Sequence, residues 1–297
     1  MITIATDCSG IEAPIEALIQ LKLPFKQLWS CEIDQFARLS SDANYPKAEQ
    51  VFTDMTSRQN KGLPLVDLYV CGFPCQSFSL AGKRLGLGDP RTSVIPSMLE
   101  TIKESKPKII ILENVIGFKS IDNGAPFALL LSILEKNYNV NVNIYNTKDY
   151  GLPQNRKRIY FVGIRKDVQK KEFIKPKTVK MLPFEGIIEN NNKIESSQMP
   201  AMYNKNVKKI KEDTKILTPY NYYNPVRNIS PTIVTRCSYF FLIKQNRPIS
   251  ILELLQLQGF PKKFKVVVSK TQITKQIGNS MSVCVVKKII KEALDCI

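Results

Sequence analysis

The feature that most constrains the fold is an apolar run over residues 66–71 that ends directly in Gly72, Phe73, Pro74 and Cys75. A strand that ends in a Gly/Pro turn delivers that turn to the carboxyl edge of an α/β sheet, where such sheets place their sites. Pro74 has a fixed φ and biases Phe73 toward an extended conformation, so Cys75 is held on a stiff corner. Most free cysteines are inert core residues. Whether Cys75 is one of them or a reactive thiol has to be judged from the residues around it.

The first 165 residues alternate short apolar runs with helical periods. Strands are predicted over 2–6, 27–31, 50–52, 66–71, 108–115, 140–146 and 159–164, and helices over 11–21, 92–103 and 124–136. The β-branched run at 108–115 is typical of a central parallel strand that is buried on both faces. The alternation predicts an α/β fold with a doubly wound, mostly parallel sheet.

From residue 166 the pattern changes, because residues 166–228 are rich in Lys, Asn and Pro and show no clear period. The elements predicted beyond them are short strands over 232–234 and 239–243, a helix over 249–258, and a last helix opened by 276–280 and running to 294. We therefore expect three parts: a large domain over 1–165, a smaller irregular domain over 166–275, and a C-terminal helical segment over 276–297.

The net charge of +17 is unevenly distributed. Residues 1–165 carry 19 basic and 16 acidic side chains, whereas residues 166–297 carry 24 and 10. An excess of this size in one half indicates a polyanionic partner, although a solubilising lysine-rich surface would give the same count. The charge favours nucleic acid as the partner.

The chain contains no histidine, which excludes histidine-based triads and histidine-ligated metals. Its seven cysteines are scattered without a Cys-x-x-Cys pair, so we expect a reducing compartment and no bound metal. The N-terminus has no basic region followed by an apolar run, and no run is long enough to span a bilayer. We expect a soluble, cytoplasmic, monomeric protein of a bacterial, phage or viral type.

Three successive predicted strands end near Gly10, Glu32 and Asp54. A glycine turn before a helix, followed about 20 residues later by an acid, suits the polar groups of a nucleoside, in particular its ribose hydroxyls. The alternative is that these acids cap the helices that follow them. Glu113 ends another apolar strand, where partial desolvation raises the pKa of a carboxyl group.

Five stretches together resemble the DNA cytosine-5 methyltransferases, in order and in spacing. They are Gly72-Phe73-Pro74-Cys75-Gln76-Ser77-Phe78-Ser79, Glu113-Asn114-Val115, Gln154-Asn155-Arg156-Lys157-Arg158, Leu257-Gln258-Gly259-Phe260-Pro261 and Gln276-Ile277-Gly278-Asn279-Ser280. One stretch departs from the family. Its first loop usually reads Phe-x-Gly-x-Gly-Gly, whereas this chain has Cys8-Ser9-Gly10-Ile11-Glu12-Ala13 and keeps only the first glycine.

The resemblance implies a Rossmann-like sheet that binds S-adenosylmethionine and transfers its methyl group to carbon 5 of cytosine in duplex DNA, as in restriction-modification systems. Cys75 would attack carbon 6 of a flipped-out base, and Glu113 would hydrogen-bond the ring nitrogen. Arg156 and Arg158 would lower the pKa of Cys75 and hold the carbonyl of the base and a nearby phosphate.

The resemblance also assigns binding residues. The S-adenosylmethionine pocket would comprise Cys8, Gly10, Ile11, Glu32, Ile33, Asp54, Met55, Pro74 and Asn279. The DNA contacts would come from Gln76, Ser79, Lys83, Arg84, Arg227 and Arg236, with residues 82–88 closing over the base.

Three alternatives remain. The first is a non-catalytic DNA-binding protein of the same fold, which would be free to lose Cys75, Glu113 and Arg158. A closer alternative is the tRNA-methylating branch of the family, whose Cys-Phe-Thr stretch is absent from this sequence. A nicotinamide oxidoreductase is less favoured, because the sequence has no complete Gly-x-Gly-x-x-Gly.

Overall fold

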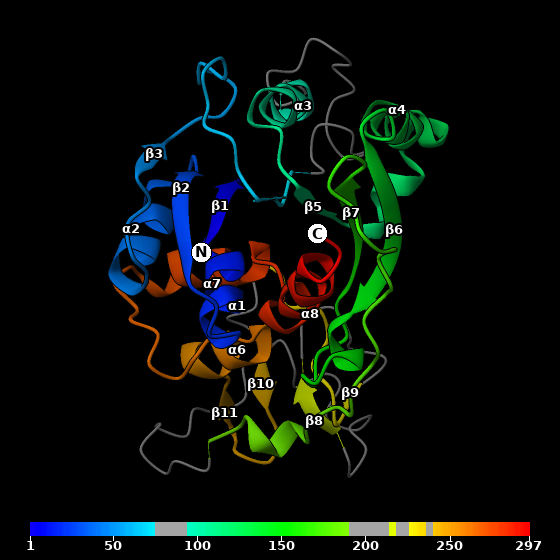
Figure 1. Ribbon diagram of the computed structural model, residues 1–297. Helices are drawn as coiled ribbons and strands as arrows, with labels where there is room; N and C mark the ends of the chain where they lie inside the picture. Colours follow the sequence, from blue (N-terminus) through cyan, green and yellow to red (C-terminus); the bar gives the residue numbers. More distant parts are fainter. Residues whose placement is uncertain (75–93, 190–213, 218–225, 236–239) are drawn as a thin grey trace.

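A seven-stranded sheet dominates the computed structural model, which describes residues 1–74, 94–189, 214–217, 226–235 and 240–297 (Figure 1). Its strands are β1 (Ile2–Asp7), β2 (Phe25–Cys31), β3 (Gln50–Phe52), β4 (Leu68–Cys71), β5 (Ile109–Asn114), β6 (Tyr138–Asn146) and β7 (Lys157–Arg165). They lie in the order β3-β2-β1-β4-β5-β7-β6, and β7 runs antiparallel to both of its neighbours. The predicted doubly wound, mostly parallel α/β sheet is confirmed.

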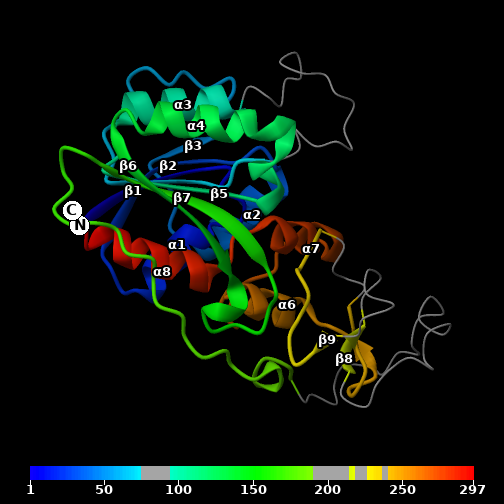
Figure 2. The same cartoon turned by 90° about the vertical axis from the view of Figure 1, so that its right-hand side faces the viewer.

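Helices cover both faces of this sheet (Figure 2). The α-helices are α1 (Ala13–Gln20), α2 (Gln35–Asn44), α3 (Val94–Ser105), α4 (Ala125–Leu134), α6 (Ile251–Gln258), α7 (Lys270–Asn279) and α8 (Val283–Leu294). Short 3-10 helices occupy Ile116–Lys119, Ile121–Gly124, Thr147–Asp149 and Phe184–Gly186. The α3 and α4 helices lie on one face and α1 and α8 on the other.

The period of two along the strands explains these two layers. Ile109 and Ile111 of β5 pack in the core shared with α1 and α8, whereas Ile110 and Leu112 pack in the core shared with α3 and α4. All four side chains are fully buried. An apolar run without polar alternation is what such a doubly covered strand requires.

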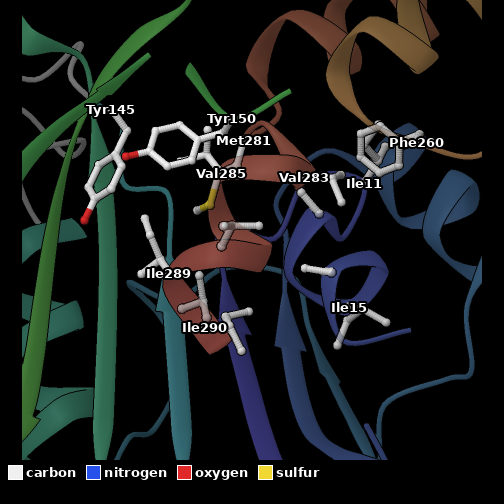
Figure 3. Close-up of a cluster of buried hydrophobic side chains, with 14 of the residues drawn as sticks. Ile11, Ile15, Tyr145, Tyr150, Phe260, Met281, Val283, Val285, Ile289 and Ile290 are labelled. Carbon is white, nitrogen blue, oxygen red and sulfur yellow. The ribbon is translucent and has the colours of Figure 1, made fainter. Parts of the chain in front are cut away.

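Helix α8 brings the C-terminal end of the chain back against its beginning (Figure 3). Ile11 and Ile15 share one buried cluster with Val283 and Ile290. At the surface, the Lys287 ammonium donates to the Gln20 side chain at 3.0 Å. Residues near the C-terminus therefore complete the hydrophobic layer beneath the first strand and helix.

A second, antiparallel sheet lies beyond α6, far from α3 and α4 (Figure 1). Its strands are β8 (Thr214–Leu217), β9 (Val226–Arg227), β10 (Phe241–Leu242) and β11 (Arg247–Pro248), in the order β11-β10-β8-β9. The strands are two to four residues long, so side-chain hydrogen bonds must supply much of the order in this part. No helix in the described ranges is long and apolar enough to cross a membrane.

Two predicted elements are wrong. Residues 232–234 lie outside the strands, because Ile233 is fixed by side chains of another segment: its N–H donates to Gln154 Oε1 at 3.2 Å. The stretch 276–280 does not open the last helix but ends α7. Ser280 is extended (φ −68°, ψ 151°) and separates α7 from α8.

Helices α2 and α7 were not predicted, and both are polar. Ala37 and Ser40 are the buried residues of α2. The two helices contact each other through Ser40, whose hydroxyl donates to the Gln276 side chain at 2.8 Å, and Asn44 also bonds the backbone of Lys265. Contacts between the predicted large domain and the second half of the chain therefore begin before residue 276.

Candidate active site

The carboxyl ends of β1, β4 and β5 converge at the middle of the large sheet. The chain winds outward from β1 through β2 to β3 and in the other direction from β4 to β5, so β1 and β4 flank the switch point where such sheets bind ligands. A β-carbon placed on Gly72 would lie 3.7 Å from Glu113 Oε2 and 4.0 Å from the carbonyl oxygen of Cys8. Met281 closes this corner, since its Cε would lie 2.9 Å from the same β-carbon.

Glu113 is a buried acid with one cationic neighbour. The residue is 8% exposed, and Arg158 Nε lies 3.3 Å from Glu113 Oε1. That oxygen makes no hydrogen bond of ordinary geometry with another described side chain. Burial raises the pKa of Glu113, and the charges of Arg158 and Arg156 counteract the rise. Burial thus favours the protonated form of this carboxyl group, which can share its proton with a ligand.

The register of β5 and β7 explains why Arg158 reaches Glu113. Glu113 pairs with Tyr160, and Arg158 lies two residues earlier on the same face of β7. The Gln-x-Arg-x-Arg spacing therefore places its last arginine beside the carboxyl group.

Arg156 has different surroundings from those expected of it. It is 2% exposed, and its guanidinium donates to the carbonyl oxygens of Ile233, Gly278 and Ser280 at 2.8, 3.2 and 2.8 Å. Three backbone carbonyls fix its position between the end of α7 and the segment around residue 233. The donors of Arg156 in these bonds are directed at backbone oxygens, and its role at the base stays a prediction.

Asn114 fixes the approach to the predicted nucleophile. Its side-chain amide donates to the carbonyl oxygen of Phe73 at 3.2 Å, two residues before Cys75. Cys75 itself lies outside the described residues, as do Gln76, Ser79, Lys83, Arg84 and Arg236, and only the backbone of Arg227 is described, in β9.

The loop that follows β1, residues 8–12, is called the first loop below. Its Gly10 N–H donates to Glu32 Oε2 at 2.7 Å, and the Asp34 N–H donates to Glu32 Oε1 at 2.9 Å. Glu32 is half-buried, and Ile33 beside it is 73% exposed. A carboxylate next to an exposed apolar side chain suits a ligand with hydroxyl groups and a flat ring.

The other predicted pocket residues lie in varied surroundings. Asp54 Oδ1 accepts from the N–H and the hydroxyl of Thr56 at 2.8 and 2.7 Å, so Asp54 also caps its own turn. Met55 is buried, with its sulfur 3.8 Å from Cys8 Sγ. Pro74 and Asn279 are exposed at the ends of β4 and α7.

The Ile11 side chain is fully buried in the hydrophobic cluster under α8 (Figure 3), so its predicted contact with the cofactor would have to come from its backbone. Only the backbone of Ile11 belongs to the edge of the first loop. The sequence signal for this was present, since Ile11 and Ile15 lie one helical turn apart on the apolar face of the predicted helix.

A buried ion pair under this edge was missed. The Arg58 guanidinium binds both carboxylate oxygens of Asp7 at 2.7 Å, and Tyr69 and Trp29 donate to the same carboxylate at 2.8 and 3.1 Å. The pair ties the end of β1 to the turn that contains Asp54. An acid at the end of an apolar strand was the available signal, but nothing in the sequence identifies Arg58 as its partner.

Among the residues that the structure describes, no group of three or more histidine, cysteine or acidic side chains is placed to hold a metal ion.

Comparisons with known proteins identify the family of the chain. A family model described as "C-5 cytosine-specific DNA methylase" matches residues 3–238 and 183–295. The type II methyltransferase M1.ScrFI of Lactococcus lactis subsp. cremoris is 33% identical over 91% of this chain and 72% of its own length. The type II methyltransferase M.NgoBI of Neisseria gonorrhoeae is 32% identical over 88% of this chain and 83% of its own length.

Solved structures share the fold at low sequence identity. A putative DNA modification methyltransferase encoded within an E. coli prophage superposes with a TM-score of 0.77 at 19% identity, covering 100% of this chain and 99% of its own. The S. pombe Dnmt2 methyltransferase superposes with a TM-score of 0.74 at 19% identity, covering 99% of both chains.

Proposed function

The chain belongs to the C-5 cytosine-specific DNA methylase family, and we propose that it transfers a methyl group from S-adenosylmethionine to carbon 5 of cytosine at a specific sequence in duplex DNA. The observation that carries this is the buried Glu113 carboxyl group beside Arg158, at the end of β5 and next to the end of β4, the strand that leads into Cys75. A protein that only bound DNA would have no use for an acid with a raised pKa at this position.

Cys75 is the proposed nucleophile. Carbon 5 of cytosine is a poor nucleophile, and addition of a thiolate to carbon 6 makes the ring electron-rich. Several described cysteines are unsuited to this role, because burial raises the pKa of Cys31, Cys284 and Cys296. Cys75 follows an exposed proline, and the positive charge of Arg158 would favour its thiolate form.

Glu113 is the proposed proton donor to the ring nitrogen opposite carbon 6. A protonated carboxyl group can donate a hydrogen bond as charge develops on the ring, and its burial keeps water from competing. Arg158 would bind the carbonyl of the base and balance the charge of Glu113. Because these atoms cannot be reached inside a base stack, the cytosine must leave the duplex.

The edge of the sheet fits S-adenosylmethionine, which when bound supplies an electrophilic methyl group. Glu32 has carboxylate oxygens for the ribose hydroxyls, exposed Ile33 offers an apolar surface for the adenine, and Asp54 lies at the next strand end for its amino group. The first loop and Pro74 would hold the rest of the cofactor. Asn279 would lie at the rim of the pocket.

The second half of the chain, with its excess of 14 positive charges, is proposed to contact the DNA. Phosphate contacts by Lys83, Arg84, Arg227 and Arg236 would weaken steeply with salt whatever the sequence, whereas base contacts would set the target. Replacing residues 170–225 with the matching stretch of a related enzyme should change the methylated sequence and leave the chemistry intact. An unchanged target would assign specificity to other residues.

Bisulfite sequencing of duplex DNA treated with the purified protein and S-adenosylmethionine tests the proposal. We expect protected cytosines at one short sequence and none with the Cys75→Ser variant as control. Methyl transfer to tRNA but not to DNA would contradict the proposed substrate. Binding of S-adenosylmethionine and DNA without transfer to either nucleic acid would contradict the catalytic role.

A further inference from the structure

The first loop has an unusual backbone. Cys8 and Glu12 both have left-handed φ angles, 49° and 57°, on either side of Gly10 at 55°. Left-handed conformations are unfavourable for residues that carry a β-carbon, and they persist where the surrounding structure enforces them. Glu12 occupies the place of the second glycine of the family pattern, so something other than glycine must maintain the turn here.

The Glu12 side chain is anchored to the two strands beneath the loop. Its Oε1 accepts from the Thr6 hydroxyl of β1 and from the Gln27 amide of β2, both at 2.9 Å. The Gln27 amide also donates to the Thr6 hydroxyl at 3.0 Å, which closes a triangle. Glu12 is 2% exposed and does not cap α1 through its side chain, although it is the N-cap residue.

The second carboxyl oxygen of Glu12 is buried and has no hydrogen-bond partner among the described residues. Burial raises the pKa of Glu12 to about 7, and the nearby Gln27, Thr6 and Ser9 side chains only partly counteract the rise. A neutral carboxyl group fits this setting, whereas an ionised one would leave an unpaired buried charge.

We propose that Glu12 is a positioning residue whose anchored side chain holds the first loop in the turn that a glycine provides elsewhere, and so presents the loop and Glu32 to S-adenosylmethionine. The link to Glu32 is direct, because the Gly10 N–H donates to its carboxylate at 2.7 Å. This inference rests on the proposed function, since it assumes that the first loop binds that cofactor.

Protonation of Glu12 should then be coupled to cofactor affinity. The groups facing it are Thr6 of β1, Gln27 of β2, Ser9 in the loop, the Glu32 carboxylate after β2, and Tyr45 after α2. Glu16 lies one helical turn further along α1. Ionisation adds a second negative charge near Glu32 and removes the neutral form that suits the buried site, so the loop should bind the cofactor less tightly above about pH 7.

Calorimetric titration of S-adenosylmethionine at several values between about pH 6 and about pH 8.5 tests this coupling. The variants are Glu12→Gln, which keeps the shape, Glu12→Ala, which keeps the β-carbon without the anchor, and Glu12→Gly, which relieves the backbone. Glu16→Gln is the matched control, since Glu16 is equally buried in α1 but bonds Gln20 and Tyr45. Comparing each variant with wild type at the same pH cancels any titration of the cofactor itself.

At pH 6 we expect Glu12→Gln to bind within about twofold of wild type, and Glu12→Ala to bind about tenfold more weakly, with Glu12→Gly in between. The ratio of wild-type to Glu12→Gln affinity should fall severalfold toward pH 8.5 and should stay constant for Glu16→Gln. DNA affinity should not change.

A constant ratio, or an affinity of Glu12→Ala within twofold of wild type, would overturn the role of Glu12. The ratio needs only Glu12→Gln, so it remains decisive if Glu12→Ala fails to fold. Failure of the wild type itself to bind S-adenosylmethionine would instead overturn the proposed function, and the role of Glu12 with it.

Discussion

The two halves of the molecule each bury an arginine that binds a carboxylate through two hydrogen bonds. In the large sheet Arg58 binds Asp7 at 2.7 Å through each pair of atoms. In the smaller part Arg247 binds Glu253 at 2.9 and 2.6 Å. All four side chains are at most 2% exposed, so the two pairs are nearly equal in chemistry and burial.

Their neighbours differ. Arg58 also donates to the Asn60 and Thr101 side chains. Its ion pair therefore links strands to α3, and these elements are already held by their own backbone hydrogen bonds. Arg247 instead donates to the backbone carbonyls of Pro248 and Glu189, and Glu253 accepts from the backbone of Ser250. In the smaller part, hydrogen bonds from side chains therefore fix the backbone, whereas in the larger part the backbone hydrogen bonds of strands and helices do so.

The largest predicted effect belongs to the large sheet alone. Replacing Glu113 with Gln removes its proton while keeping its shape, and should slow methyl transfer by about 10²–10⁴-fold. The matched control is Glu189→Gln in the smaller part. Glu189 is half-buried and forms an ion pair of 3.8 Å with the exposed Lys262, and its replacement should leave the rate unchanged. Single-turnover kinetics measures both. A Glu113→Gln rate within tenfold of wild type would assign stabilisation of the ring nitrogen to another group.

The two arginine pairs should respond alike in stability and differently in binding. Arg58→Met and Arg247→Met each leave a buried carboxylate without its partner, so each should lower the free energy of unfolding by about 3–5 kcal/mol. Arg58→Met should weaken S-adenosylmethionine binding, and Arg247→Met should weaken DNA binding. Urea unfolding and two affinity titrations provide the measurements. If both variants lost affinity for the same ligand, the assignment of S-adenosylmethionine binding to one part and DNA binding to the other would be wrong.

Arg156 joins the two parts, and its replacement by Lys should have an intermediate effect. A lysine cannot reach the three carbonyl oxygens of Ile233, Gly278 and Ser280, so the variant should lose about 1–3 kcal/mol of stability. DNA affinity should fall, while the transfer rate at saturating DNA should stay within about tenfold of wild type. A rate as low as that of Glu113→Gln, at unchanged DNA affinity, would assign Arg156 a direct role at the base.

The last effect is a dependence of stability on pH. The pKa of Glu12 rises from 4.5 to about 7 on folding, so the folded protein binds more protons between those values and loses stability as the pH rises through them, by about 1.4 kcal/mol per pH unit at most. Asp34, Asp67 and Glu253 have lowered pKa values, so their contributions are lost in the opposite direction, as the pH falls. Urea unfolding of wild type minus Glu12→Gln isolates the Glu12 contribution. A pH-independent difference would contradict a raised pKa.

The sequence was informative where periodicity decides structure. All strands of the large sheet were predicted, and the central ones most directly, because burial on both faces leaves a continuous apolar signal, as in 109–112. Helices α2 and α7 were not predicted, because each buries few apolar side chains and is held by hydrogen bonds between residues distant in sequence, such as Ser40 and Gln276.

The site was predictable only in part, for the same reason. Strand ends identified Glu32, Asp54 and Glu113, since the carboxyl edge of a parallel sheet gathers such residues. The different surroundings of Arg156 and Arg158 could not be predicted, because two residues of one strand differ only in what folds against them. The partnership of Arg58 with Asp7 spans 51 positions and has no local signature.

The most direct test of covalent catalysis by Cys75, in the turn after β4, is to trap the covalent adduct between protein and DNA. The substrate is duplex DNA that contains 5-fluorocytosine at the methylated position. Wild type with S-adenosylmethionine should form an adduct that survives denaturing electrophoresis. So should the control Cys296→Ser, since Cys296 is buried in the C-terminal turn and bonds the Glu172 and Glu292 carbonyls. Cys75→Ser should bind the same DNA and form no adduct. An adduct with Cys75→Ser, or none with wild type that still methylates unmodified DNA, would contradict the account.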